Sequence, residues 1–227
     1  AYTDNSFKFW LAEQINRGAK IIHGQHGAGH NIYKEFFGDY HETNISEKYF
    51  TWGWKNKNKK IVPVGNYLIK EKDSNKILYN KKFLLVFPVA NIFKRDANIF
   101  YADSLAEDVI EYQKFIDNID SNLLNFFSTR NHPQKARREL DFLNFISYDK
   151  KKIKNIQTNI SFDKAITNCG LIIFNYLSTE FFKLISLNIP CLLLLNKNVF
   201  NYLVADEVKI DFYKLSDVGI FYTDGAE

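Results

Sequence analysis

The chain has 227 residues, a formal net charge of +4 and 46% hydrophobic residues. This length and composition suit one large folded domain, or a domain with part of another, and argue against a disordered chain. The lysines are scattered over polar stretches rather than gathered in a stripe, so a nucleic-acid partner is not expected. The apolar runs are far shorter than the ~20 residues that cross a bilayer, and Cys169 and Cys191 lie in apolar surroundings typical of free, buried thiols.

Helical and strand periodicities mark the first part of the chain. In chain order they predict a helix over 7–17 closed by Gly18, a buried strand over 19–22, a helix over 31–37 and a polar loop over 39–46. A strand over 47–54 and a strand with its turn over 61–66 follow. The polar segment 68–79 follows, and we expect it to act as a hinge between two structural units.

From residue 81 onwards, predicted strands alternate with predicted helices. The strands are expected over 83–87, 125–130, 171–174 and 189–195, and the helices over 103–119, 161–168 and 178–187, with a helix or a helical loop over 135–146. The uninterrupted apolar run at 83–87 is typical of a central parallel strand. Alternation of this kind predicts an α/β fold with a doubly wound parallel sheet and right-handed crossovers.

The turn after the first predicted strand reads His-Gly-Gln-His-Gly-Ala-Gly-His over residues 23–30, with Glu35 close behind. Glycines at the carboxyl end of a strand let the backbone approach a ligand, and free amides there favour an anion. Histidine is well suited to proton transfer near neutral pH, so His26 is a candidate for catalysis or phosphate contact. Two interpretations stay open beside it. The three histidines could bind zinc, although their spacing matches no common structural zinc signature, or the turn could serve architecture alone.

Two further motifs follow predicted strands in the second part of the chain. Arg130 and His132 end one strand, where a phosphate could bind, and Pro133 fixes the turn. Ser178 and Thr179 open a helix, where hydroxyls and free amides either cap the helix or bind a phosphate. Each motif alone is equally typical of a polar turn or a plain helix cap, and the two together in one α/β unit favour a phosphate site.

Two tryptophans, Trp52 and Trp54, end the strand predicted over 47–54. Because residues two apart in a strand point to the same face, both rings are expected on one face. Aromatic side chains bury readily, so the sequence favours packing in the core over stacking on a sugar or a base.

The order of these motifs resembles bacterial GT-B-type glycosyltransferases of surface polysaccharide synthesis. It is most similar to a family of sugar transferases in which a Gln-His-Gly-Gly turn precedes a glutamate and a Trp-Gly-Trp. This chain has Gln-His-Gly at 25–27, with Ala28 in place of the second glycine, then Glu35 and Trp-Gly-Trp at 52–54. The His-Pro, Tyr-x-Ser-Thr and Asn-Ile-Pro motifs are more distantly similar to sialyltransferases, Kdo transferases and CDP-glycerol polymer transferases, which hold a cytidine nucleotide.

The resemblance implies a GT-B-like fold of Rossmann-type domains. Residues 1–80 would be the end of an acceptor-side domain plus a linker, and 81–227 a donor-nucleotide-binding domain, in a fragment of a longer two-domain protein. The implied reaction moves a sugar or a glycerophosphate-like group from a nucleotide-activated donor to a surface carbohydrate acceptor, without a metal or another cofactor. The expected location is the cytoplasm, with peripheral association at the inner face of the membrane.

The residues assigned to this reaction fall into two groups. The predicted catalytic residues are His26 and Glu35, and the predicted donor- and phosphate-binding residues are Gly27, Arg130, His132, Ser178 and Thr179. Two other functions stay open, namely a GT-B-shaped nucleotide-sugar epimerase and a non-catalytic carbohydrate-binding remnant.

Overall fold

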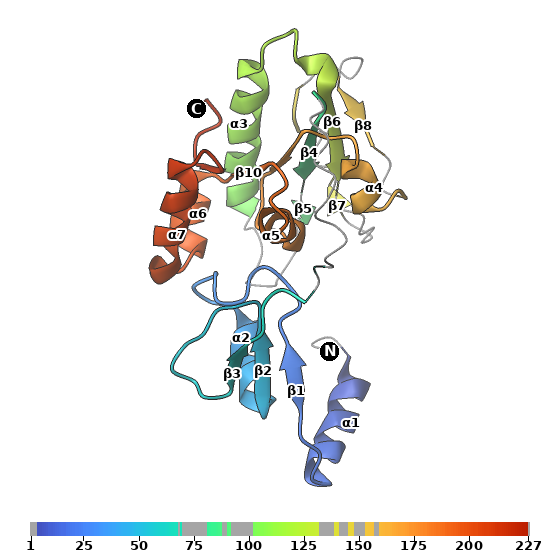
Figure 1. The fold of residues 1–227 in the computed structure, drawn as a ribbon, viewed down its shortest axis with the longest axis vertical. Coiled ribbons are helices and arrows are strands. Elements are labelled where there is room, and N and C mark those ends of the chain that lie inside the picture. The colour runs from blue at the N-terminus through green and yellow to red at the C-terminus, as the bar shows by residue number, and fades with distance from the viewer. Residues whose placement is uncertain are drawn as a thin grey trace. The chain divides into compact units, whose positions relative to one another are not determined.

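The computed structural model describes residues 4–67, 69, 81–87, 90–91, 102–131, 139–140, 145–147, 153–156 and 159–226. The chain divides into two compact units (Figure 1). Unit 1 comprises Ala1–Asn31 and Phe36–Leu68, and unit 2 comprises Ile32–Glu35 and Ile69–Glu227. The segment predicted as a hinge, 68–79, lies outside the described residues except for position 69.

Unit 1 is built on a three-stranded parallel sheet in the order β1-β2-β3. Its elements are α1 (Asn5–Asn16), β1 (Ile22–Gly24), α2 (Phe37–Ile45), β2 (Lys48–Thr51) and β3 (Ile61–Pro63). Helix α1 confirms the first predicted helix. Asp4 caps it by accepting a hydrogen bond from the Phe7 amide at 3.0 Å, and Gly18 follows its end with φ at 91°.

The order of elements after β1 differs from the prediction. The buried strand expected over 19–22 is wrong, because pairing with β2 begins only at Ile22 and continues through His23 and Gly24. The helix expected over 31–37 is also wrong. Asn31 has φ at 59°, which breaks a right-handed helix, and α2 instead occupies the stretch that was expected to be a polar loop.

The strand predicted over 47–54 ends early. β2 stops at Thr51, and Gly53 has φ at 124°, so the two tryptophans lie in a turn rather than on a strand. The expectation that Trp52 and Trp54 share one strand face is therefore wrong, although both side chains are half-buried.

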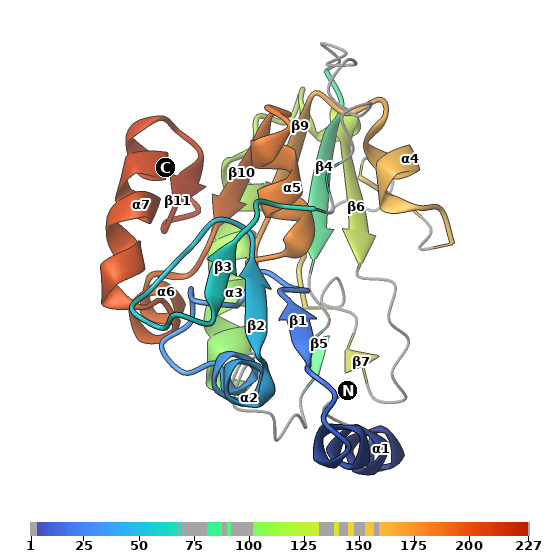
Figure 2. The same ribbon diagram turned by 60° about the horizontal axis from the view of Figure 1, so that its bottom comes forward.

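Unit 2 contains a six-stranded sheet in the order β11-β10-β9-β4-β6-β8, and every neighbouring pair is parallel (Figures 1 and 2). Its strands are β4 (Phe83–Phe87), β6 (Phe127–Asn131), β8 (Lys154–Asn155), β9 (Leu171–Phe174), β10 (Cys191–Leu194) and β11 (Phe221–Tyr222). Its helices are α3 (Ala102–Asn118), α4 (Phe162–Ile166), α5 (Thr179–Ser186), α6 (Lys197–Leu203) and α7 (Asp206–Asp217), with a 3-10 helix over Leu124–Phe126. The predicted α/β fold with a parallel sheet between helices is confirmed.

One predicted helix of unit 2 is not supported where it is described. The stretch 135–146 contains β7 (Glu139–Leu140), which pairs antiparallel with β5 (Ala90–Asn91). Most of that stretch lies outside the described residues.

The core of unit 2 explains why β4 was recognisable from its composition. Leu84 and Val86 belong to a buried cluster that includes Phe181 and Leu184 of α5. The alternate residues Leu85 and Phe87 belong to a second cluster, which includes Tyr112 and Ile116 of α3. A strand buried on both faces must be apolar at every position, as 83–87 is.

The segment Ile32–Glu35 is part of unit 2, although the residues on both sides of it belong to unit 1. It pairs antiparallel with the connection between α6 and α7, where Tyr33 bridges Val204 and the Lys34 amide donates to the Leu203 carbonyl at 2.8 Å. Burial raises the pKa of Tyr33 to about 12.

Both cysteines are free, as predicted, with Cys191 buried and Cys169 half-buried. In the ranges given above, the structure contains no helix with the length and apolar character needed to cross a bilayer.

Candidate functional site

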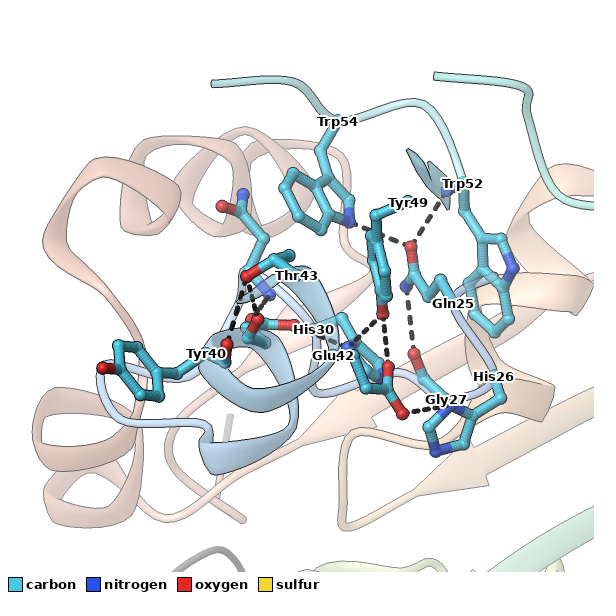
Figure 3. A network of polar contacts seen from close by, with 12 residues as sticks. Gln25, His26, Gly27, His30, Tyr40, Glu42, Thr43, Tyr49, Trp52 and Trp54 are labelled. Atoms are coloured by element: carbon cyan, nitrogen blue, oxygen red, sulfur yellow. Dashed lines mark hydrogen bonds and ion pairs between the residues drawn. The ribbon is translucent and has the colours of Figure 1, made fainter. Parts of the chain in front are cut away.

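The side chain of Gln25 joins two turns of unit 1 (Figure 3). Gln25 is only 3% exposed, and its Oε1 accepts hydrogen bonds from the Trp52 amide and from Trp54 Nε1, both at 2.9 Å. Its Nε2 donates to the carbonyl of Gly27 at 3.0 Å. The turn that carries His26 is thereby fixed to the turn that follows β2.

Hydrogen bonds also hold the backbone of the same turn. The Gln25 amide donates to the Phe50 carbonyl at 2.8 Å, and the Tyr67 hydroxyl donates to the Gln25 carbonyl. A Cβ at Gly24 would lie 2.8 Å from the Tyr67 hydroxyl oxygen. Glycine at this position therefore allows the close approach of the Tyr67 ring to the chain.

His26 projects from the turn next to a buried carboxylate. Its side chain is 56% exposed, and its Nδ1 lies 3.6 Å from Oε1 of Glu42 in α2, whose side chain is almost fully buried. Burial lowers the pKa of His26, and the Glu42 charge opposes that shift only in part. His26 is therefore largely neutral at pH 7 and can accept a proton, while Glu42 would stabilise the imidazolium that results.

A second histidine, His30, is buried in contact with His26. The two rings meet edge to face, with centroids 4.9 Å apart. Nδ1 of the fully buried His30 lies 2.5 Å from Oδ1 of Asp39 and 2.9 Å from the Tyr49 hydroxyl. That hydroxyl donates to Oε2 of Glu42 at 2.9 Å, so Tyr49 fixes the carboxylate whose other oxygen faces His26 (Figure 3).

Asp39 also organises the start of α2. Its Oδ1 faces His30 and its Oδ2 accepts a hydrogen bond from the Asn31 amide at 2.6 Å. An imidazole whose Nδ1 hydrogen is given to a carboxylate keeps the lone pair on Nε2. His30 Nε2 is buried and receives no hydrogen bond from the part of the chain that the structure describes.

The third histidine of the turn serves the fold. His23 lies in β1, and its Nδ1 is 2.7 Å from Oγ of Ser46, whose hydroxyl donates to the Glu42 carbonyl. Ser46 therefore accepts from His23, which ties the end of α2 to β1. Burial lowers the pKa of His23, and the Glu42 charge offsets part of this shift.

The same residues offer the ligands of a metal site. One ligand atom each from His26, His30 and Glu42 lie within 4.8 Å of one another. Two histidines and a carboxylate form a donor set found in catalytic zinc sites, and the Asp39 contact to His30 resembles the outer shell of such sites. These three residues could hold a divalent ion, although their separation is looser than the ~3.4 Å expected between tetrahedral zinc ligands.

The predicted catalytic residue Glu35 has an exposed side chain and belongs to the short segment of unit 2. Its catalytic role stays a prediction. The carboxylate that faces His26 belongs to Glu42, which the sequence had placed in a loop.

Two of the predicted donor-site residues in unit 2 have structural partners. Arg130 is buried at the end of β6, and its Nη2 donates to the Ile160 carbonyl at 2.5 Å. Burial lowers the pKa of Arg130, while Glu180 and Tyr176 act in the opposite direction. Ser178 is the N-cap of α5, where its Oγ accepts from the Phe181 amide at 3.0 Å.

The structure gives less information on the other residues predicted for the donor site. Thr179 is the first residue of α5 and is half-buried. His132 and Pro133 lie outside the described residues. The helix cap that was the alternative interpretation of Ser178 is present in the structure. Phosphate binding at Arg130, His132, Ser178 and Thr179 stays a prediction.

The sequence singles out the turn that carries Gln25 and His26, but it did not point to Asp39, Glu42 and Tyr49, which lie beside this turn. A signal was available, because Asp39 and Glu42 are three residues apart and share one face of a helix. That signal depends on recognising α2, which a search for apolar periodicity does not do.

Comparisons with known proteins gave one match, to a protein family. No curated protein and no solved structure matched the chain. The model of a family described as the LIC12162 family transferase matched residues 1–227. The chain therefore belongs to the LIC12162 family of transferases.

Proposed function

We propose that this transferase moves a sugar, or a glycerophosphate-like group, from a nucleotide-activated donor to a surface carbohydrate acceptor. The observation that carries the proposal is His26, an accessible imidazole with a lowered pKa beside a buried and oriented carboxylate. Transfer to a hydroxyl is assisted by a base that is unprotonated at the working pH, and the His26 imidazole with its lowered pKa is such a base. The resemblance to surface-polysaccharide glycosyltransferases supports the choice of a carbohydrate acceptor.

In the proposed reaction, the acceptor hydroxyl gives its proton to Nε2 of His26, because Nδ1 faces Glu42. The acceptor oxygen then forms a bond to the transferred group. The bond from that group to the donor phosphate breaks, and the phosphate oxygen takes the electron pair. Glu42, held by Tyr49, stabilises the positive charge that develops on His26.

Unit 2 would bind the donor. Parallel α/β sheets bind nucleotides at the carboxyl ends of their strands. Of the predicted donor-site residues, Arg130 is the last but one residue of β6, His132 follows β6 in the sequence, and Ser178 and Thr179 come after β9. The amides at the start of α5 favour a phosphate. We assign the donor phosphate to these residues of unit 2, and we propose that the donor is a cytidine nucleotide and that the protein acts at the inner face of the membrane. The phosphate contact predicted for Gly27 in unit 1 stays a prediction.

The experiment is a screen of CMP, CDP, UDP, GDP and ADP by calorimetry, joined to a transfer assay with the activated form of the best-bound nucleotide. His132→Ala should weaken nucleotide binding about tenfold or more, because a charge-assisted hydrogen bond to phosphate contributes roughly 1.5–3 kcal/mol. Absence of binding to all five nucleotides by the parent protein would overturn the proposal. Equal binding by His132→Ala and the parent would remove only His132 from the donor site.

Two matched variants test which carboxylate, that of Glu42 or that of Glu35, takes part in the reaction. Glu42→Gln should lower turnover with little change in nucleotide affinity, and Glu35→Gln tests the role predicted from the sequence. Glu47→Gln is the control, since Glu47 is exposed and pairs only with the exposed Lys20 at 3.6 Å among the described contacts. Loss of turnover in Glu35→Gln but not in Glu42→Gln would return the role to Glu35.

A metal-assisted transfer is the second candidate, favoured by the His26, His30 and Glu42 cluster. In that case turnover would fall on dialysis against a chelator and return on addition of zinc. If His26 acts as the base, chelation leaves turnover unchanged and added zinc inhibits, because the ion would occupy the imidazole.

A further inference from the structure

We propose that Asn175 binds the nucleobase of the donor in unit 2. This inference rests on the proposed function, since it names the part of the donor that one residue recognises. It concerns a residue that is not among the predicted site residues.

Asn175 is buried without hydrogen-bond partners. It follows β9 directly and is 1% exposed. Neither its Oδ1 nor its Nδ2 has a hydrogen-bond partner among the residues that the structure describes. Burial of an amide without partners costs free energy, so native proteins keep such groups where a ligand or an ordered water completes them.

The position of Asn175 in the sheet favours a ligand. β4 and β9 are parallel neighbours, with Val86 opposite Phe174. The chain leads from β4 to β6 on one side and from β9 to β10 on the other. Adjacent strands whose connections run in opposite directions form the crevice where doubly wound sheets bind ligands, and Asn175 comes at the carboxyl end of one of them.

Arg130 lies at a matching height on the other side of β4. Val86 is the register partner of both Phe174 and Arg130, so the Arg130 backbone is level with the residue before Asn175. A guanidinium suits a phosphate, and an amide suits a neutral polar ring. The two strand ends therefore present complementary chemistry for the two ends of a nucleotide.

The chemistry of the amide narrows the ligand class. A phosphate offers acceptors alone, so it would satisfy Nδ2 and leave Oδ1 without a partner. The edge of a nucleobase offers a donor beside an acceptor, which matches both atoms of an asparagine amide. Ribose hydroxyls could also supply both, and the test separates them from the base.

Thr129 provides a matched control. It is 1% exposed, and its Oγ1 also has no hydrogen-bond partner among the described residues. Thr129 is level with Leu85 in the interior of the sheet, away from the strand ends. Thr129→Val removes a buried unpartnered group at nearly constant shape, with no expected effect on a ligand.

The test measures thermal unfolding without ligand, and calorimetry with ribose 5-phosphate and the tightest-binding nucleotide of the five-nucleotide screen. For Asn175→Leu we expect an unchanged or raised Tm, a Kd for the nucleotide raised about tenfold or more, and a Kd for ribose 5-phosphate within about twofold of the parent. Thr129→Val should match the parent in both affinities. Equal nucleotide affinity in Asn175→Leu, or an equal loss with ribose 5-phosphate, would overturn the assignment to the base.

A lowered Tm or failure to fold in Asn175→Leu would also overturn the inference, because the amide would then hold the fold. These outcomes leave the donor site itself intact as long as the parent binds a nucleotide. Only a parent protein that binds none of the five nucleotides would remove the proposed function together with this inference.

Discussion

The two units bury polar side chains in opposite ways. In the described part of unit 1 the buried polar residues are Gln25, His30, Glu42, Ser46 and Thr51, beside the apolar Ala28, Tyr49 and Ile61. In unit 2 the strands β4, β9 and β10 are apolar throughout. Of the six buried polar residues in its described part, three follow strand ends, two lie in β6 and one lies in α3. Unit 1 therefore depends on hydrogen bonds where unit 2 depends on apolar burial, and the two should respond differently to the same substitutions.

The largest expected effect is catalytic and falls in unit 1. His26→Ala should lower turnover by roughly 10²–10⁴-fold, the usual contribution of a general base, with nucleotide affinity retained. Because the His26 side chain is more than half exposed, stability should change by less than about 0.5 kcal/mol. The measurement is a transfer assay beside thermal unfolding, with His41→Ala as the control histidine of unit 1.

An unchanged turnover in His26→Ala would break the assignment of the reacting site to unit 1. A large loss of stability would instead place His26 with the hydrogen-bonded support of the turn.

The next effect is on stability, and it compares two glutamine side chains that make the same number of hydrogen bonds, one in each unit. Gln25→Leu removes three side-chain hydrogen bonds in a buried setting and should destabilise the protein by about 2–4 kcal/mol. Gln113→Leu in unit 2 also removes three, with Asp117 and twice with Ser147. Those partners are exposed and regain water, so its cost should stay below about 1 kcal/mol. Denaturant unfolding of both variants checks the comparison, and equal costs would refute it.

The last effect is a pH dependence of stability in unit 2. Burial raises the pKa of Asp108 to about 8, with a further contribution from Glu107. Since an unfolded aspartate titrates near pH ~3.9, the folded state holds the proton more tightly between about pH 4 and pH 8. The stability contributed by Asp108 is thus complete below pH ~4 and is lost as the pH rises toward 8, at no more than about 1.4 kcal/mol per pH unit.

Asp108→Asn tests this sign. The variant should unfold with a shallower pH dependence than the parent between pH 5 and 8, measured by denaturant unfolding at each pH. A steeper dependence, or identical curves, would show that Asp108 is ionised in the folded state.

The same contrast explains what the sequence could predict. The strands at 83–87 and 171–174 and the helices α3 and α5 were expected from apolar periodicity, because unit 2 buries apolar faces. In α2 the pattern is inverted, with Tyr40 74% exposed and Glu42 buried. A polar face turned inward looks like a loop to any search for apolar periodicity, so the partner of His26 was missed.

The prediction at the two tryptophans was wrong for a related reason. A strand was expected to continue through Trp52 and Trp54, but the positive φ of Gly53 and the hydrogen bonds of Gln25 define a turn there. Those hydrogen bonds join residues 27 and 29 positions apart, and spacing within a short window cannot reveal them.

The most direct measurement of the central claim is the pH dependence of kcat/KM for the parent and for Glu42→Gln. Burial lowers the pKa of His26 and the Glu42 charge raises it, so the acid limb of the parent should lie below pH 6.5. Removal of that charge should move the acid limb to still lower pH and reduce the plateau rate. An acid limb that stays at the same pH in Glu42→Gln would contradict the account of His26 and Glu42 as the reacting pair.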